Sequence, residues 1–291
     1  MSTRIDRSRL ARRSDARSLL LVIAHVGFVL APAYLAAFWG PGWHLVPLWL
    51  WLGLGMNGLL NLLHECAHYH VFTKRRGSDI LGRWILGPMA VADFDSYRKR
   101  HWDHHRKLGQ DDDPKTTYHA DIHGWRWFAY LVRCLLLIEG LKRFSVQTHG
   151  EEVDDPPILA VGRDPAGTDL LIWLLRSSLA QALFFGSLFL VGWTAHQSLP
   201  GALVASITAY GFVYLYGLSS VTVFAAGLRA IAEHQIGSDG AATVGRAALR
   251  NFSCNPVSRL IMGAYGFGEH ATHHQIPSIP YYHLVQVTSD L

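Results

Sequence analysis

The sequence predicts an all-α integral membrane protein with four transmembrane helices, arranged as two hairpins, and a cytoplasmic cap of short and interfacial helices. Two observations lead to this prediction. Half of the 291 residues are hydrophobic, and only 16% are charged. Asp, Glu, Lys and Arg are also absent from two long blocks, Ser18–Leu63 with 46 residues and Ser177–Leu228 with 52 residues. Since one span takes about 20 apolar residues, each block is long enough for two spans.

Each charge-free block has a break near its middle. The first break is Gly40-Pro41-Gly42, and the second is Leu199-Pro200-Gly201. Gly and Pro are the residues that most often interrupt helices, so each block is expected to form one helical hairpin. The four predicted spans lie at about 18–39, 43–63, 177–195 and 202–226.

The distribution of charge predicts the orientation in the membrane. The N-terminal tail, residues 1–17, carries six arginines, whereas the hairpin tips near 40–44 and 194–200 carry no charge. The positive-inside rule then places the tail in the cytoplasm and the tips outside. A cleaved signal peptide is disfavoured, because no small-residue cleavage site follows the basic stretch and the apolar block continues too far. We therefore expect a multi-pass protein of a bacterial inner membrane, with its N-terminus and its functional site in the cytoplasm.

The polar region between the two blocks, residues 64–176, is expected to form the cap. Within it, Trp125–Phe144 has basic residues around an apolar body, which is typical of a helix lying on a membrane surface. A fifth span is the competing interpretation, but an odd number of spans would put the His-rich segments on opposite sides. With no internal repeat and no low-complexity linker, residues 1–291 are expected to form one domain. Nothing indicates binding of nucleic acid.

Most of the 17 histidines gather in short segments at helical spacing. Residues spaced i, i+3 and i+4 share one face of a helix. With an even number of spans between them, these segments all reach the cytoplasmic side, where they are able to converge on one site. Neutral imidazole is the commonest protein metal ligand, and eight or nine imidazoles are too many for one four-coordinate zinc but suit two ions. The candidate ligands are His64, His68, His101, His104, His105, His234, His270, His273 and His274.

The ligand set leaves the metal and the class of protein open. Imidazole-rich shells suit iron, zinc, copper or nickel, of which iron or copper supports oxygen chemistry. One alternative is an intramembrane zinc metalloprotease that uses His64-Glu65-His68, with Glu65 as the base. That protease commonly takes a third ligand from an Asp in a later span, and the second charge-free block has none. The other alternative is a non-catalytic metal-binding membrane protein, but carriers place ligands within their spans, whereas these clusters lie beyond the inner ends.

The histidine segments resemble the three histidine boxes of the membrane fatty-acid desaturase and hydroxylase superfamily, which are integral-membrane di-iron enzymes. The boxes read HECAH at 64–68, HWDHH at 101–105 and HATHH at 270–274. DDDPK at 111–115 is similar to the acidic-proline segment of that superfamily, and HHQIPSIPYYHL at 273–284 looks like the ending of acyl-lipid desaturases. In the stearoyl-CoA type, a lone His between boxes two and three is a ninth ligand, and His234 occupies the matching place. The resemblance runs from the first span to Leu284.

The resemblance implies two non-haem iron ions, O2 as co-substrate, and hydrogen abstraction from unactivated C–H bonds of an apolar substrate from the bilayer. The Pro-Ser-Ile-Pro-Tyr-Tyr ending favours desaturation of an acyl-type lipid chain. Hydroxylation or ketolation of a lipid, a carotenoid or a small amphiphile remains the alternative. The sequence has no haem-binding segment and no nucleotide fingerprint, so electrons are expected from a separate ferredoxin, rubredoxin or cytochrome b5 type protein.

Three further groups of residues are predicted to support this chemistry. Carboxylates beside the candidate ligands are expected to orient imidazoles through the second ring nitrogen; they are Glu65, Asp103 and Glu233. Candidates for a substrate channel in the second and fourth spans are Trp51, Met56, Tyr214 and Tyr216. Basic cap residues are candidates for docking an acidic electron donor, with contact to anionic lipid headgroups as the alternative; they are Lys74, Arg75, Arg76, Arg98, Lys99 and Arg100.

Overall fold

The computed structural model describes residues 13–108, 110, 113–114, 124–141, 168–234, 249–252 and 255–290. The regular structure in this part of the chain is helical, apart from one isolated bridge between His234 and Leu249. Four of the described helices are long and apolar enough to cross a membrane: Asp15–Trp39, Leu45–Ala67, Leu171–His196 and Leu199–Glu233. The predicted all-α membrane fold class is therefore confirmed.

The first hairpin consists of α2 (Asp15–Trp39) and α3 (Leu45–Ala67). The Ser14 side chain caps α2 by accepting a hydrogen bond from the backbone N–H of Arg17, and α2 ends at Gly40, whose φ of +76° suits glycine. α3 continues four residues beyond the predicted end of the second span at Leu63. The apolar pattern stops at Leu63, but the helix continues because the polar residues that follow are buried inside the protein rather than exposed to lipid.

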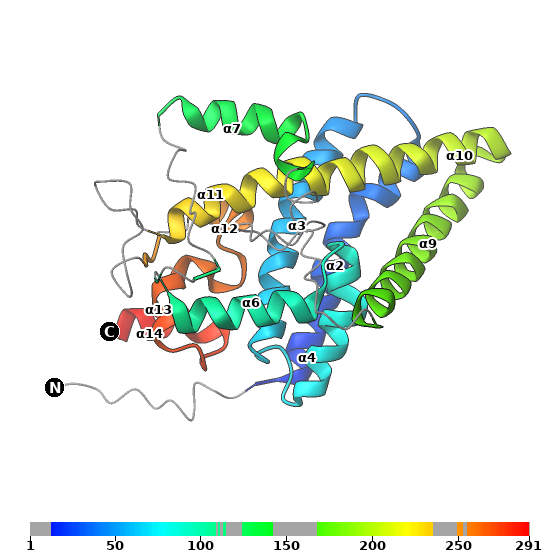
Figure 1. The fold of residues 1–291 in the computed structure, drawn as a ribbon. Helices are drawn as coiled ribbons and strands as arrows, with labels where there is room; N and C mark the ends of the chain where they lie inside the picture. The colour runs from blue at the N-terminus through cyan, green and yellow to red at the C-terminus, as the bar shows by residue number, and fades with distance from the viewer. Residues whose placement is uncertain are drawn as a thin grey trace.

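The second hairpin consists of α9 (Thr168–His196) and a long continuous helix. That helix comprises α10 (Leu199–Thr208), the π-helical segments η3 (Ala209–Tyr216) and η4 (Leu218–Thr222), and α11 (Val223–Glu233). Figure 1 shows it running from α10 at the upper right to α11 at the left, across α3. It ends seven residues beyond the predicted limit at 226, so His234 follows directly after its last turn.

Small residues bring the second and fourth spans into close contact. Thr222 Oγ1 donates a hydrogen bond to the carbonyl of Gly53 at 2.9 Å. A Cβ atom added at Gly53 would lie only 2.3 Å from Cβ of Val221, so glycine alone fits at this crossing. Nearby, the rings of Trp49 and Tyr216 stack with centroids 5.3 Å apart. Close backbone approach at small residues is a common way of packing helices in membranes.

Gly53→Ala is expected to destabilise the protein by about 1–3 kcal/mol, because the added methyl group overlaps Val221 and separates the two spans. The measurement is thermal or denaturant unfolding of the protein in detergent. Gly186→Ala on α9 is the matched control, since nothing lies within 4 Å of a Cβ added there. Equal stabilities of the two variants would contradict the close crossing.

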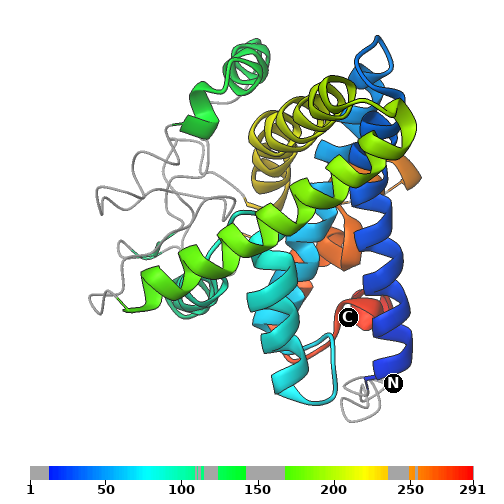
Figure 2. The same cartoon turned by 90° about the vertical axis from the view of Figure 1, so that its right-hand side faces the viewer.

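Short helices pack at the ends of the spans that lie away from the two hairpin turns. In Figure 1 the turns that join α2 to α3 and α9 to α10 lie toward the upper right, whereas α6, α13 and α14 lie toward the lower left, and Figure 2 shows α2 and α3 side by side in the second view. These short helices are α4 (Arg75–Leu81), η1 (Gly82–Leu86), α5 (Gly87–Met89), α6 (Phe94–Lys107), α7 (Arg126–Leu135), α12 (Pro256–Ile261), η6 (Ala264–Glu269), α13 (His270–Gln275) and α14 (Tyr281–Asp290).

α7 covers Arg126–Leu135 of the predicted interfacial helix, Trp125–Phe144. The helix breaks at Leu136 and Leu137, where the φ of Leu137 is +61°, and residues 138–141 are helical again. Tyr130 is buried and its hydroxyl donates to the carbonyl of Val223 at 3.3 Å, which fixes α7 against the C-terminal half of the fourth span. The other face exposes Trp127 and Phe128. With 10 residues, α7 is too short to cross a membrane, which argues against the fifth span. Residues 142–144 of the predicted segment lie outside the described part of the chain, and a position at the membrane surface stays a prediction.

Candidate metal centre

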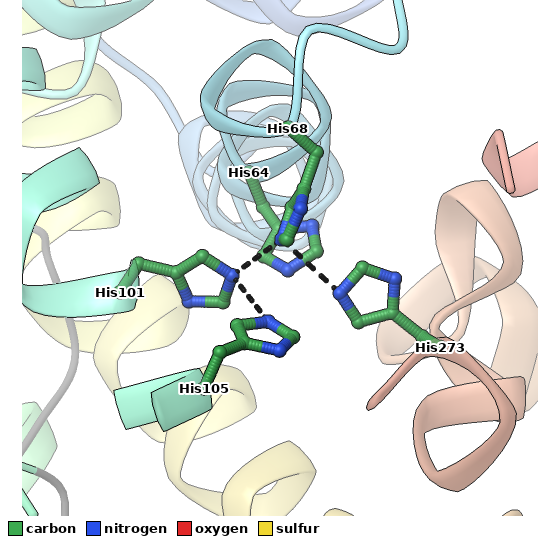
Figure 3. A group of neighbouring side chains, drawn as sticks. All are labelled: His64, His68, His101, His105 and His273. Carbon is green, nitrogen blue, oxygen red and sulfur yellow. Dashed lines mark hydrogen bonds between the residues drawn. The ribbon is translucent and has the colours of Figure 1, made fainter. Parts of the chain in front are cut away.

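Five of the candidate histidines form one cluster where three segments meet. His64 and His68 come from the end of α3, His101 and His105 from α6, and His273 from α13. One ligand atom from each of these residues lies within 4.8 Å of the others. Figure 3 shows the five rings turned toward a common point from these three directions. We call this group the five-histidine cluster.

Local structure places these side chains. The Asp93 side chain caps α6 by accepting hydrogen bonds from the backbone N–H groups of Asp95 and Ser96. Trp102 Nε1 on α6 donates to the carbonyl of Ala67 at 3.2 Å, which ties α6 to the end of α3. Before α13 the backbone turns sharply through two left-handed residues, Tyr265 with φ +59° and Gly266 with φ +71°. This turn directs the third histidine segment back toward α3 and α6.

The distances within the five-histidine cluster fit a shared cation better than hydrogen bonds. His101 Nε2 lies 2.7 Å from His68 Nε2 and 3.0 Å from His105 Nε2, and His68 Nε2 lies 3.2 Å from His273 Nε2. Each ring nitrogen has either one N–H or one lone pair, so four nitrogens form at most two hydrogen bonds and not these three contacts. Two nitrogens bound to one ion at about 2.1 Å and at right angles lie about 3.0 Å apart. The donor set therefore fits a first-row metal ion.

A second cluster adjoins the first. His104, His270 and His274 bring ligand atoms within 4.8 Å of one another, and so do Glu233, His234 and His270. His270 Nε2 lies 3.2 Å from His234 Nε2. The rings of His105 and His274 stack across the two clusters with centroids 4.1 Å apart. We call these five residues the second cluster, and all nine predicted histidines thus lie in two neighbouring groups.

The protonation state of the clusters suits metal binding. Burial, together with the neighbouring imidazoles, lowers the pKa of His68 and of His274 well below the usual range. Both rings are therefore neutral at pH 7. The neutral imidazole is the form that binds a metal.

Two buried carboxylates bind the Nδ1 atoms of candidate metal-binding histidines. Glu65 Oε1 accepts a hydrogen bond from His64 Nδ1 at 3.0 Å, and Asp113 Oδ1 accepts one from His104 Nδ1 at 2.8 Å. Nδ1 is thereby occupied, and Nε2 is the nitrogen that each ring offers to a metal. A carboxylate on the second ring nitrogen is the usual way in which proteins fix the orientation and raise the basicity of a ligating histidine.

Residues 41–291 match the sequence profile of the fatty acid desaturase family. This chain belongs to the fatty acid desaturase family. Shorter segments are similar to lipid desaturases: 66 residues are 32% identical to the chloroplastic omega-6 fatty acid desaturase of Glycine max, covering 22% of this chain and 15% of that protein. A segment of 77 residues is 31% identical to the sn-1 oleoyl-lipid 12-desaturase of Synechocystis sp., covering 26% of this chain and 21% of that protein. The matched segments thus span about a fifth or less of the length of these relatives.

Two site residues of this desaturase-family protein were not predicted. Asp113 belongs to the DDDPK segment, and its distance from the histidine box gave no sign that it contacts His104. His70 lies two residues after His68 and would face away if the helix continued. The helix instead ends at Ala67, and Tyr69 adopts a left-handed φ of +59°. His70 is consequently buried, and its Nδ1 donates to Glu65 Oε2 at 3.0 Å.

The prediction that Asp103 orients an imidazole does not agree with the geometry. Its carboxylate pairs with Arg106 at 3.2 Å on the outer side of α6. Each helical residue is rotated by about 100° from the one before, so a carboxylate adjacent in sequence to a ligand lies on another face. Glu233 was likewise predicted to contact the ring nitrogen that points away from the metal, but it does not. Its Oε2 lies 3.9 Å from His270 Nε2, on the side of the ring that faces the second cluster.

The described cavity beside the histidines is lined by residues other than the predicted channel residues. Its apolar wall includes Tyr265, Phe267 and Leu284. The four predicted residues pack elsewhere: Met56 is fully buried in the core, Trp51 lies against Phe28, Tyr214 donates to the carbonyl of Met89 and Tyr216 to that of Leu135. All four therefore have packing contacts within the fold, and a channel lined by them stays a prediction.

The predicted docking residues fall into two groups. Arg98 pairs with Asp79 and thereby joins α4 to α6. Its guanidinium also lies over the rings of Tyr69 and Phe94, so its contacts are made within the fold. Lys74, Arg75, Arg76 and Lys99 are exposed and Arg100 is partly exposed. Docking of an electron donor on the exposed group stays a prediction.

Proposed function

We propose that this protein is an O2-dependent membrane oxidoreductase with two non-haem irons, and that it desaturates the acyl chain of a lipid. One observation carries the proposal. The ligand atoms of nine histidines, from four separate segments, lie in two adjoining clusters at the ends of helices long enough to cross a membrane. Membership of the fatty acid desaturase family agrees with this chemistry.

In this proposal the five-histidine cluster holds one iron, and the histidines of the second cluster hold the other. Two irons bound there would supply the activation of O2 and the removal of hydrogen from an unactivated C–H bond. The protein's own residues do the rest. Glu65 and Asp113 fix the orientation of His64 and His104, and burial keeps bulk water from the clusters.

The choice of an acyl chain rests on two observations. The relatives described above are named as desaturases of fatty acids or of oleoyl lipids. In addition, the cavity that touches His64, His270 and His273 has an apolar wall. A substrate carbon placed against this wall would lie next to residues of both clusters.

The electron donor is proposed to be a separate small redox protein that approaches from the cytoplasm. The exposed basic residues Lys74, Arg75, Arg76 and Lys99 support a donor with an acidic surface, because complementary charges speed association. The six arginines of the N-terminal tail support the cytoplasmic orientation.

The test is the metal content per chain of the detergent-purified protein and of a His273→Ala, His274→Ala double variant. His273 belongs to the five-histidine cluster and His274 to the second cluster, so the variant removes one ligand from each. We expect about two irons per chain in the native protein and loss of both in the variant. Native protein supplied with lipid, O2 and a reducing partner should then yield a product with two fewer hydrogens. One zinc per chain, unaffected by the variant, would instead favour a protease built on His64, Glu65 and His68.

A further inference from the structure

Glu233 lies near a different ring nitrogen from the one that Glu65 and Asp113 contact. Glu65 and Asp113 each contact an Nδ1 atom, the ring nitrogen turned away from the cluster. Glu233 Oε2 instead lies 3.9 Å from Nε2 of His270, and that Nε2 is 3.2 Å from Nε2 of His234. The carboxylate thus points at the place where the metal-facing nitrogens of two histidines meet. Glu233 is also almost completely buried, with 2% of its surface exposed.

A chain of polar contacts fixes this carboxylate. One turn earlier on α11, Arg229 Nε lies 2.9 Å from Glu233 Oε1, so one oxygen faces a buried cation and the other faces the cluster. Arg229 NH1 in turn donates to Asn61 Oδ1 on α3. Asn61 Nδ2 donates to the carbonyls of Met262 and Ala264, at 3.2 and 3.0 Å, just before the third histidine segment. The second oxygen of Glu233 is thus held by an ion pair with a buried guanidinium, and ligating carboxylates are usually supported by such a neighbouring group.

We propose that Glu233 Oε2 is a direct ligand of the metal in the second cluster, beside His234 and His270, and that Arg229 is its positioning residue. This inference rests on the proposed two-metal function. It makes the two metal positions unequal: the five-histidine cluster offers only neutral nitrogens, whereas the second cluster adds an anionic oxygen. Because a negative ligand stabilises the more highly charged ion, the second metal would be the harder one to reduce.

The test is Mössbauer spectroscopy and iron content of the full-length protein in detergent, for the native chain and for Glu233→Gln. We expect two distinct iron signals in the native protein. In Glu233→Gln one signal should change while the other stays, and competition with a chelator should show one iron bound more than about 100-fold more weakly. That loss exceeds the 10–100-fold that removal of an orienting group typically causes.

Glu65→Gln is the matched control, since it removes a buried carboxylate that contacts only Nδ1 atoms. It should keep the signal that Glu233→Gln changes. If Glu233→Gln does not fold, Glu233→Asp keeps the charge and draws the oxygen back by one methylene, and it should still alter that signal. Two native irons with an unchanged spectrum and affinity in Glu233→Gln would overturn this inference alone. A native protein without two irons would overturn the proposed function as well.

Discussion

His68→Ala and His274→Ala are each expected to leave about one iron per chain and to reduce lipid turnover by more than about 100-fold. His68 Nε2 lies within 3.2 Å of Nε2 atoms from both α6 and α13, so its removal opens the centre of the five-histidine cluster. His274 belongs to the second cluster only. Loss of a ligand should cost more than loss of a group that merely orients one. The measurements are iron content per chain and product formed per chain.

The matched control for these variants is His25→Ala. His25 lies in the first span, and its Nε2 contacts the carbonyl of Gly55 at 3.1 Å, outside both clusters. This variant should keep both irons. If His68→Ala instead lost both irons while His274→Ala lost none, the two clusters would not be separate binding positions.

Asp113→Asn is expected to weaken iron binding at the second cluster, and the turnover that depends on it, by about 10–100-fold. The Asp113 side chain is fully buried and accepts from His104 Nδ1 with both oxygens, at 2.8 and 3.1 Å. Asparagine has nearly the same shape, but it lacks the negative charge that raises the basicity of the imidazole. Chelator competition followed by iron analysis measures the change in affinity.

Asp103→Asn is the control for this effect. It makes the same chemical change ten residues earlier in the chain, on a side chain that pairs with Arg106 and contacts none of the candidate ligands in the described part of the protein. Its iron affinity should be close to native. Equal losses in the two variants would mean that general charge near α6, rather than the contact with His104, explains the result.

The fold class was predictable because membrane spans and helix faces are encoded in short, continuous stretches of sequence. A membrane span is marked by composition over about 20 residues, and i, i+4 spacing places His64 and His68 on one helix face wherever that helix lies. The same reasoning put nine histidines on one side of the membrane before any distance was known. Their role as metal ligands remains a proposal that the metal analysis tests.

Contacts between distant segments were not predictable. Asp103 is adjacent to a histidine in the sequence but lies on another face of α6, whereas Asp113 reaches His104 only because the chain turns back. The end of α3 at Ala67 could not be predicted either, because no glycine or proline follows it directly. None of the predicted channel residues lines the cavity beside the histidines, for a related reason. Aromatic side chains such as Tyr214 look alike in a sequence, whether they line a cavity or pack in the core.

The separation of the ligands along the chain has a consequence for how the centre is made. His68 and His273 contact each other but are 205 residues apart. At a synthesis rate of about 5–20 residues per second, roughly 10–40 s pass between the emergence of the first and the second from the ribosome. During that interval four members of the five-histidine cluster, those from α3 and α6, already exist without the fifth, so zinc or copper ions could bind them. Under the proposed two-iron function, correct loading would therefore depend on events after the last histidine segment has docked, and release of a wrong metal would belong to that stage.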